Sequence, residues 1–510
     1  MSDVAHPSIR SDKAASLPVI FLGILGAIQM SDPMVANLAL VKATKALSFS
    51  PSMQALAASI STLALAATVV PSGVVADKIG RRKMLVIALL LAALGDVIAA
   101  IAPAAPVFLL GRAITGVGLG AVFACSFGIV RSVTTDRAFP PALGIFAAMC
   151  SVPLFIFMPL GSALAGVSWR AAFLMIPVVA VIGALLCFKI LPNLPPVASA
   201  KKEYWGLVAL GVGVVALLIG VSSLAKSLTS PNTLVPLAVG VLAMVAFIQI
   251  EKRAKNPTYP VSLFKSPLFL VGALGGFAWN AASAVGQLLS SNLWQYVDGF
   301  TPFKASIYQM PIMVFSIVAS VLAGRVIGKG RSAVGVLVVG GVLTAVGLVA
   351  AGLTASQSQS LIFLAAFCVA FFGCGVMTVP QSQMFVQESP PEFYGPVTSS
   401  RTCVGQLAYA IGLAGGAAIA SSITASRLIS DAGLSTEAAS EEVGKFITGG
   451  KTSVADITSY YTAGFSMAMY AFAVLVGLCT VVILILGRKA SARSKEHGAV
   501  DASNAAAAAA

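Results

Sequence analysis

Long apolar runs recur along the chain, and short segments between them hold nearly all of its charged residues. A helix needs about 20 apolar residues to cross a bilayer, and only helices and closed barrels satisfy their own backbone hydrogen bonds there. With 10% charged and 58% hydrophobic residues, the chain has the composition of a membrane protein. We therefore predict an all-α integral membrane protein. Its fourteen transmembrane helices are expected at about 17–40, 52–76, 84–102, 106–130, 139–166, 169–191, 204–225, 233–250, 268–291, 304–327, 333–353, 359–386, 397–422 and 464–487.

An even number of spans places both termini on one side of the membrane. With the N-terminus inside, 23 of the 32 lysines and arginines fall in inner segments, including Arg401 at the start of span 397–422. Eight fall outside and Arg112 lies within a span. Because basic residues concentrate on the cytoplasmic side, we expect cytoplasmic termini, an uncleaved first span and a place in the inner (plasma) membrane of a bacterium. The net charge of +14 then reflects topology and not nucleic-acid binding.

The sequence lacks the spacing that enzymes and metal sites need. All seven cysteines lie in apolar segments without metal-type spacing, and the only histidines, His6 and His497, lie in the tails. There is no phosphate-binding loop, no nucleophile elbow and no pair of acids on a soluble face. We therefore expect no enzyme activity, no cofactor and no metal, and we expect an ion or solute gradient to supply the energy.

Residues 73–83, GVVADKIGRRK, form the densest charge cluster between two apolar runs and predict a tight cytoplasmic turn. The pattern Gly73, Asp77, Gly80, Arg81 and Arg82 resembles the signature that the major facilitator superfamily carries between its second and third helices. The resemblance implies that Asp77 and the two arginines latch an inner gate between two halves of the protein. A similar but incomplete pattern follows at 324–331, where Gly328 takes the place of the aspartate.

Further stretches resemble the fourteen-span drug:proton antiporter branch of this superfamily, namely 32–40, 251–257 and the positions Leu293, Gln295 and Gly299. The span 139–166 and the residues after it resemble the antiporter signature of the superfamily. Here Pro159, Gly161, Trp169, Arg170 and Phe173 agree, while Met158 and Ser162 replace the usual glycines. Pro159 and Gly161 favour a helix that can bend. The two replacements leave obligatory antiport open.

The resemblance implies two six-helix bundles around a central cavity. The expected parts are a cytoplasmic tail at 1–16, an N-terminal bundle at 17–191, a linker with two extra transmembrane helices at 192–267, a C-terminal bundle at 268–487 and a cytoplasmic tail at 488–510. We expect the last six alanines to be an expression remnant. The long outer loop at about 427–459 is either an amphipathic cap or a solvated segment.

Two charged residues within spans are the first functional candidates, because a charge in hydrocarbon is costly. Asp32 lies beside Pro33, with Gln29 and Asn37 about one turn away on either side. Arg112 needs a counter-ion, and similar depth makes Asp32 the first choice. The resemblance implies that this pair couples proton binding to cavity opening. Alternatively, both residues are structural. Asp32 would then hydrogen-bond backbone groups that Pro33 leaves without a partner, and Arg112 would donate to backbone carbonyls.

Asp96 is the other intramembrane acid and a third candidate for proton coupling. No basic residue lies near it in the sequence, so we expect it to be protonated or to face water. The resemblance makes its helix peripheral, which argues against a place on the transport pathway.

Polar and aromatic residues of the second half are the candidates for a substrate cavity, together with Gln29 and Asn37. Neutral amides in a bundle interior suit a ligand without fixed charge. A sulfur-rich aromatic wall suits varied substrates, although such stripes also occur as packing. The candidates are Trp279, Asn280, Gln287, Asn292, Gln295, Phe371 and Met377.

Taken together, these features predict a proton-coupled secondary transporter that exports amphipathic or cationic organic compounds by alternating access. A facilitator or lipid and metabolite carrier without obligatory antiport stays open, as does, less favoured, a non-transporting sensor or scaffold. The expected partners are a small amphipathic organic substrate, protons and membrane lipids, with no nucleic acid, and the expected state is a monomer.

Overall fold

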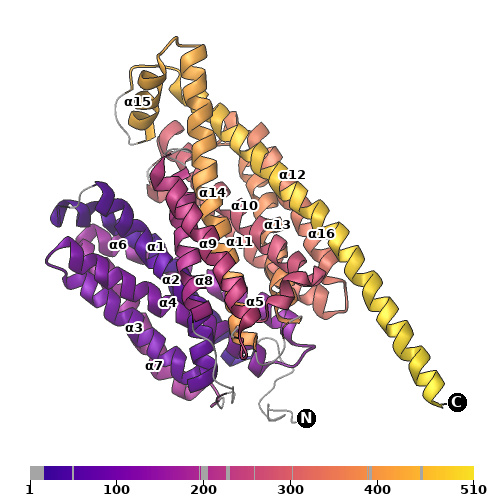
Figure 1. Cartoon of the computed structure of the whole chain (residues 1–510). Helices are drawn as coiled ribbons and strands as arrows, with labels where there is room; N and C mark the ends of the chain where they lie inside the picture. The colour runs from indigo at the N-terminus through magenta and orange to yellow at the C-terminus, as the bar shows by residue number, and fades with distance from the viewer. Residues whose placement is uncertain are drawn as a thin grey trace.

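The structure is a computed structural model that describes residues 16–48, 51–193, 196, 205–224, 230–257, 259–300, 302–387, 389, 393–447 and 452–509. Helices dominate these residues (Figure 1). They are α1 (Leu17–Ala46), α2 (Pro51–Ile79), α3 (Arg81–Ile101), α4 (Ala105–Val133), α5 (Phe139–Ser151), α6 (Leu154–Val167), α7 (Trp169–Ile190), α8 (Trp205–Leu224), α9 (Pro231–Arg253), α10 (Pro267–Asn292), α11 (Pro302–Gly328), α12 (Ala333–Leu353), α13 (Leu361–Gln387), α14 (Tyr394–Ser430), α15 (Thr436–Ile447) and α16 (Ile457–Ala509). The all-α membrane fold is therefore confirmed.

Among the described residues, twelve helical segments are long and apolar enough to cross a membrane. Two shorter apolar segments, Leu17–Pro33 in α1 and Trp205–Val221 in α8, occupy the two remaining predicted positions. The count of fourteen crossings stays a prediction. The last predicted span ends at residue 487, whereas α16 continues as one helix to Ala509.

One predicted span is two helices. The run 139–166 was expected to be continuous, but α5 ends at Ser151 and α6 begins at Leu154. Pro153 lies at the break, because proline has no N–H to donate and its ring clashes with the preceding turn. Pro159 lies inside α6, and Gly161 packs so closely on α1 that an added Cβ would lie 2.6 Å from the Val35 side chain. The bending role of these two residues stays a prediction.

Two bundles repeat the same helix packing. In the first, α4 packs on α2 and α3, and in the second, α13 packs on α11 and α12. A Cβ added to Gly116 of α4 would lie 2.8 Å from the Ala64 side chain of α2, and one added to Gly375 of α13 would lie 2.8 Å from Ala319 of α11. The equivalent close approaches indicate a structural repeat between the two halves of the chain.

The turns at 80 and 330 each contain a glycine with positive φ. Gly80 precedes α3 with φ of 95°, and Gly330 precedes α12 with φ of 88°. Both values lie in the left-handed region, which side chains with a Cβ rarely adopt. The short turn between α2 and α3 is therefore tight, and we call the end of the molecule that contains it the α2–α3 end.

A helix caps the opposite end, which we call the α15 end. Within the predicted outer loop 427–459, α15 packs Ala439, Val443 and Phe446 toward the C-terminal bundle, and Phe446 contacts the ring of Tyr461 at 5.3 Å. Figure 1 shows this helix at the top of the molecule. Of the two alternatives for this loop, the structure has the amphipathic cap.

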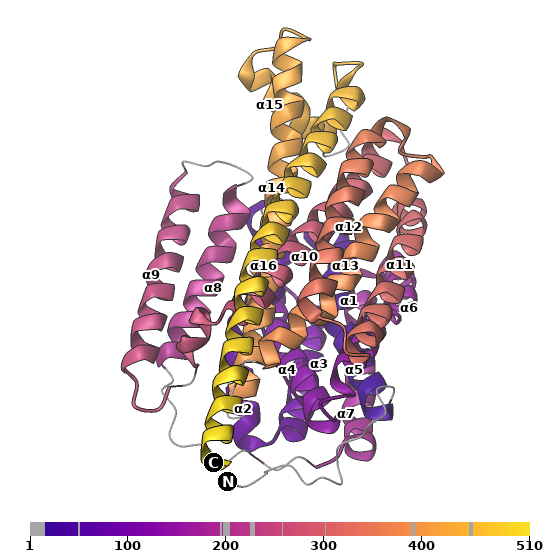
Figure 2. The same ribbon diagram turned by 90° about the vertical axis from the view of Figure 1, so that its right-hand side faces the viewer.

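In the sequence, α8 and α9 lie between the two bundles, and they form a hairpin. Gly220 faces Leu237, and Gly240 faces Leu217, so the two helices pack closely. The hairpin lies at one side of the molecule, and α8 packs on α14 and α2 (Figure 2). After α9, Glu251 accepts a hydrogen bond from the Tyr259 backbone N–H at 3.0 Å, which fixes the connection to the second bundle.

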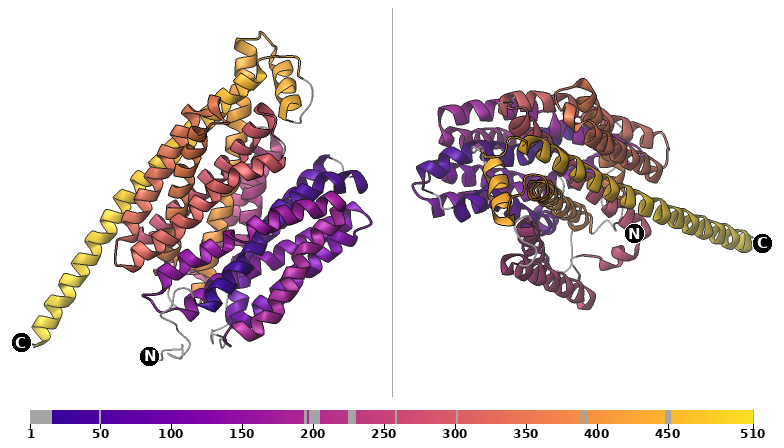
Figure 3. Two further views of the ribbon diagram at one scale, coloured as in Figure 1. Left: turned by 180° about the vertical axis from the view of Figure 1, so that it is seen from behind. Right: turned by 90° about the horizontal axis from the view of Figure 1, so that it is seen from above.

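The two bundles meet near the α2–α3 end and diverge toward the α15 end (Figure 3). A Cβ added to Gly324 of α11 would lie 2.8 Å from the Pro140 carbonyl of α5. Cys403 of α14 donates to the Ala66 carbonyl of α2 at 3.5 Å. By contrast, α6 packs mainly on α1 and α7 of its own bundle. The described conformation is therefore closed at the α2–α3 end.

Candidate functional site

Three charged side chains of the predicted spans gather between α1, α3 and α4. Arg112 donates from Nη1 to Asp32 Oδ1 at 2.7 Å and from Nη2 to Asp32 Oδ2 at 2.8 Å. The same Nη1 donates to Asp96 Oδ1 at 2.8 Å. Ser61 and Thr115 donate to Asp32 Oδ2 and Asp96 Oδ1 at 3.1 and 2.8 Å. We call Asp32, Asp96 and Arg112 the acid–arginine cluster.

Of the two alternatives for Asp96, the water-facing one is wrong, and the protonated one stays a prediction. Asp96 is fully buried, so it does not face water, and Arg112 is its basic partner. The partner lies on the next helix, because α3 and α4 form an antiparallel pair. The predicted pair of Asp32 and Arg112 is therefore a group of three that includes Asp96.

Close helix packing builds the cluster. A Cβ on Gly95 would lie 2.3 Å from the Thr115 backbone nitrogen, and one on Gly111 would lie 2.6 Å from the Ala99 nitrogen. These glycines let α3 and α4 approach until side chains of both reach Arg112. Phe173 of α7 covers the guanidinium, with its ring centre 5.4 Å from Cζ.

The cluster is occluded and unequal in charge. Asp32, Asp96 and Arg112 are 2%, 0% and 1% exposed, so water does not solvate their charges. Two carboxylates share one guanidinium, and Asp96 Oδ2 and Arg112 Nε have no hydrogen-bond partner in the described structure. With both acids ionised the cluster carries one net negative charge, and one bound proton would make it neutral. Because buried net charge is costly, the occluded cluster favours that proton. Asp96 Oδ2 is the free oxygen that could hold it.

The predicted gate residues form a second polar cluster at the α2–α3 end. Arg81 is buried, and its Nε donates to Asp77 Oδ1 at 3.0 Å. Its Nη1 donates to the Gly128 carbonyl and to Ser132 Oγ of α4 at 2.8 and 2.9 Å. Gly73 is buried in α2, and Gly80 forms the turn.

The neighbouring arginine binds within the same bundle, because Arg82 Nη1 donates to the Leu191 carbonyl at 3.1 Å. These hydrogen bonds of Arg81 and Arg82 join parts of the N-terminal bundle and do not cross to the other one. The latch role of Asp77, Arg81 and Arg82 stays a prediction.

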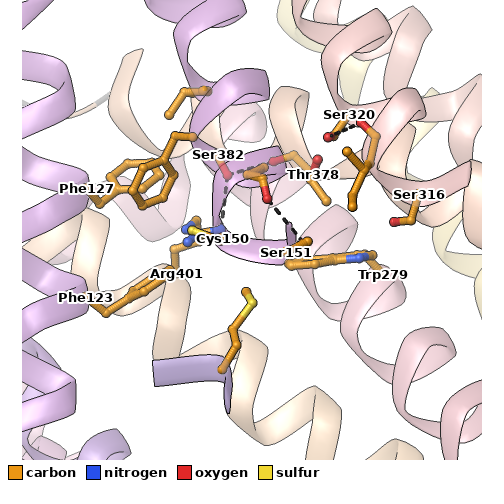
Figure 4. A pocket seen from close by; sticks show the side chains of 15 residues that line it. Phe123, Phe127, Cys150, Ser151, Trp279, Ser316, Ser320, Thr378, Ser382 and Arg401 are labelled. Atoms are coloured by element: carbon orange, nitrogen blue, oxygen red, sulfur yellow. Dashed lines mark hydrogen bonds between the residues drawn. The ribbon is translucent and has the colours of Figure 1, made fainter. Parts of the chain in front are cut away.

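A pocket lies between the bundles and is lined by residues of both (Figure 4). It encloses about 610 Å³, including space open to solvent. Its lining mixes aromatic, aliphatic and hydroxyl side chains and comes from seven helices, α1, α4, α5, α10, α11, α13 and α14. The lining residues are Met30, Phe123, Phe127, Leu143, Phe146, Ala147, Cys150, Ser151, Trp279, Ser316, Ile317, Ser320, Thr378, Ser382 and Arg401. We call this the central pocket.

Of the predicted cavity residues, Trp279 lines the central pocket. Phe371 and Met377 do not, because both are buried in the core of the C-terminal bundle, at 6% and 0% exposure. Their stripe is therefore packing in this conformation. Gln29 is also buried, and the side chain of Asn37 lies outside the described residues.

The predicted amides do not line the pocket either. Asn280 donates to the Gly276 carbonyl of its own helix at 2.8 Å, and the Gln287 carbonyl accepts from Gln309 at 3.3 Å. Asn292 lies at the end of α10, and Gln295 lies in the π-helical turn after it. Gln295 faces a shallow hollow beneath α15 with Phe446. These amides do not converge on one ligand position.

Sequence reasoning missed Arg401. It was counted with the basic residues of the inner segments and not as a charge within a span, and the structure places it in α14, on the wall of the central pocket. The available signal was its position inside the predicted span 397–422, which makes it an intramembrane arginine like Arg112.

Comparison with known proteins identifies the family. The model of the Major Facilitator Superfamily matches residues 22–413. The chain belongs to this superfamily. A relative from Salmonella paratyphi A, named "Putative multidrug resistance protein MdtD", is 29% identical over 296 residues, or 57% of this chain and 62% of the relative. The match thus spans less than two thirds of that relative's length.

Solved superfamily structures share the fold. The human organic anion transporter MFSD10 (TETRAN) has a TM-score of 0.62 at 16% identity, covering 91% of this chain and 98% of that one. The proton:xylose symporter XylE has a TM-score of 0.58 at 15% identity, with 92% and 94% covered. The chain is therefore a membrane transporter of the Major Facilitator Superfamily, and the resemblance seen in the sequence is confirmed.

Proposed function

We propose that this Major Facilitator Superfamily transporter is a proton-coupled exporter of amphipathic organic compounds in a bacterial inner membrane. The observation that carries the proposal is the acid–arginine cluster, whose two acids and one arginine are buried in the transmembrane region. A scaffold has no need for three such charges in hydrocarbon. The similarity to a relative named for multidrug resistance supports export of organic compounds.

Two helices connect the cluster with the central pocket. Met30 and Asp32 lie on α1, and Arg112 and Phe123 lie on α4. Along α4, Arg112 and Phe123 are separated by roughly 16 Å, at a rise of about 1.5 Å per residue. A shift of either helix that accompanies proton binding at the cluster therefore also moves the pocket wall.

Protonation changes what holds the helices together. A carboxylate that takes up a proton loses its ionic attraction to Arg112, so the link between α1, α3 and α4 weakens at that point. In the predicted orientation the α2–α3 end faces the cytoplasm, so the described conformation would be outward-facing. Because the cluster is occluded in it, proton exchange requires another conformation of the cycle.

Transport in proteoliposomes tests the proposal. The probes are three pyrene derivatives with the same alkyl linker and a sulfonate, carboxamide or trimethylammonium group. With an imposed pH gradient, we expect accumulation of at least one probe, and its loss in Asp32→Asn and Asp96→Asn. Asp456→Asn, on the exposed segment before α16, is the matched control and should transport normally.

The outcomes separate the candidate functions. Equal, gradient-independent movement by the native protein and both variants would identify a facilitator and contradict proton coupling. Failure of all three probes to move would contradict the export of amphipathic compounds.

A further inference from the structure

Arg401 is the one charged side chain among the residues that line the central pocket. It lies on α14, and its guanidinium sits between two aromatic rings of α4 and the hydroxyl groups of α13 (Figure 4). The lining contains no aspartate or glutamate. The pocket thus carries a positive charge and no negative one.

The contacts of Arg401 are all with neutral groups. Its Nη1 donates to Ser382 Oγ at 3.1 Å, and its Cζ lies 4.8 Å from the ring centre of Phe127 and 5.4 Å from that of Phe123. Its Nε is buried and has no hydrogen-bond partner among the described residues. Hydroxyl and aromatic groups orient a guanidinium but do not neutralise it.

Two buried arginines of the N-terminal bundle differ from the half-buried Arg401 in this respect. Arg112 has two carboxylate partners, and Arg81 has Asp77. Among the described residues, none of the ion pairs includes Arg401. A guanidinium that is partly withdrawn from water is stabilised by a counter-ion, so an anion in the pocket would complete the contacts of Arg401.

Ser382 cannot take the place of that anion, because its hydroxyl is neutral and already accepts two hydrogen bonds. Its hydroxyl donates to the Thr378 carbonyl at 2.7 Å and accepts from Gln381 Nε2 at 2.9 Å as well as from Arg401. Among the described residues, Ser382 is the hydrogen-bond partner of the guanidinium through Nη1, so Nη2 can meet a molecule in the pocket. Trp279, Phe146 and Met30 provide apolar surface for the body of such a molecule.

We propose that the central pocket binds amphipathic organic anions, with the acidic group on Arg401 and the apolar body against the aromatic wall. A guanidinium presents parallel N–H donors that match the oxygens of a carboxylate, sulfonate or phosphate. This inference deepens the proposed function, because it names the substrate class for the same pocket. It also replaces the preference for cationic compounds that the sequence favoured, since the pocket lining offers no carboxylate to bind a cation.

Equilibrium binding to the purified full-length protein tests the inference. The sulfonate, carboxamide and trimethylammonium pyrenes are titrated by fluorescence anisotropy in detergent micelles, with protein-free micelles as the blank. We expect the sulfonate to bind at least about tenfold more tightly than the trimethylammonium probe. Arg401→Gln should weaken sulfonate binding at least about tenfold and leave carboxamide binding within about threefold.

Control variants keep the test decisive. Arg401→Lys retains the charge and should recover part of the sulfonate affinity, while Arg427→Gln, an exposed arginine on the same helix, should change nothing. If Arg401→Gln does not fold, the inference is still tested by the sulfonate affinity of Arg401→Lys and by the order of affinities of the three probes for the native protein. Equal affinity for the three probes, or equal weakening of all three by Arg401→Gln, would overturn the inference and leave Arg401 as a contact between the bundles.

Two further outcomes concern the source of the anion and its link to transport. Displacement of the sulfonate probe by dioctanoyl phosphatidylglycerol, but not by naphthoate, would assign the site to an anionic lipid; the reverse would assign it to free acids. Both results support an anion site. Binding is measured without a pH gradient, so selective binding without gradient-driven transport would contradict the proposed function alone.

Discussion

Asp32 and Asp96 place their Oδ1 atoms against the same nitrogen of Arg112, at 2.7 and 2.8 Å. The two acids come from α1 and α3, so a single guanidinium on α4 ties three helices together. Removing the arginine would leave two buried carboxylates next to each other. The cluster is therefore as important for the stability of the N-terminal bundle as for its proposed role in coupling.

We predict that Arg112→Gln destabilises the protein by about 3–5 kcal/mol, because breaking a buried pair leaves uncompensated charge. Unfolding in mixed micelles with increasing denaturing detergent measures this loss. Arg427→Gln, which removes an arginine that is 55% exposed, should cost less than about 0.5 kcal/mol.

A combined variant distinguishes charge from packing. Adding Asp32→Asn and Asp96→Asn to Arg112→Gln removes every charge of the cluster, and should recover much of the lost stability. A triple variant no more stable than Arg112→Gln would show that lost packing, and not unpaired charge, causes the effect.

Close approach of α2 and α4 gives the second prediction. A Cβ on Gly116 would lie 2.1 Å from the Ser61 carbonyl oxygen, which is backbone and cannot rotate away. Gly116→Ala should therefore force the helices apart and cost about 1–3 kcal/mol in the same unfolding measurement. Gly375→Ala, at the equivalent position of the second bundle, should behave alike.

The matched control for this pair is Gly477→Ala in α16, because nothing lies within 4 Å of a Cβ built there. Its stability should equal that of the native protein or slightly exceed it, since alanine favours the helix. Equal stability of Gly116→Ala and Gly477→Ala would contradict the close packing of α2 on α4.

Hydropathy was sufficient to predict the helical membrane fold, because each span must be apolar over most of its length whatever its neighbours are. The sequence also suggested Asp32 as the partner of Arg112, since few charges lie within spans. The contact between Asp96 and Arg112 was missed, although their positions in the sequence could have suggested it. In an antiparallel pair, residues at similar distances from the connecting loop lie at similar depth, and Asp96 and Arg112 flank the turn between α3 and α4 in this way.

The central pocket could not be predicted in the same way. Its lining comes from helices of both bundles, and hydropathy does not say which face of a helix meets the other bundle. Phe371 and Met377 carry a suitable pattern but face their own core, whereas Phe123 and Phe127 face Arg401. The break at Pro153 was likewise hidden inside a continuous apolar run.

The cap at the α15 end gives a pH-dependent prediction. Glu442 accepts a hydrogen bond from the Ser453 backbone N–H at 2.8 Å and one from Lys445 Nζ at 3.2 Å. The Ser453 bond chiefly, with the help of Lys445, lowers the pKa of the Glu442 carboxyl below its ordinary value of 4.5. A carboxyl with a lowered folded-state pKa stabilises the fold above its unfolded pKa and loses that effect as the pH falls through the folded value.

We therefore expect the amides of α15 to be protected from hydrogen exchange at pH 6 and to lose protection as the pH falls below about 4.5, through the lowered pKa of Glu442. Hydrogen exchange with mass spectrometry, corrected for the intrinsic rate at each pH, measures this. Glu442→Gln should have low protection already at pH 6, with little further change on acidification. Glu437→Gln, an exposed position on the same helix, should keep the native profile. An unchanged profile in Glu442→Gln would show that the packing of Val443 and Phe446, and not the carboxylate, holds the cap in place.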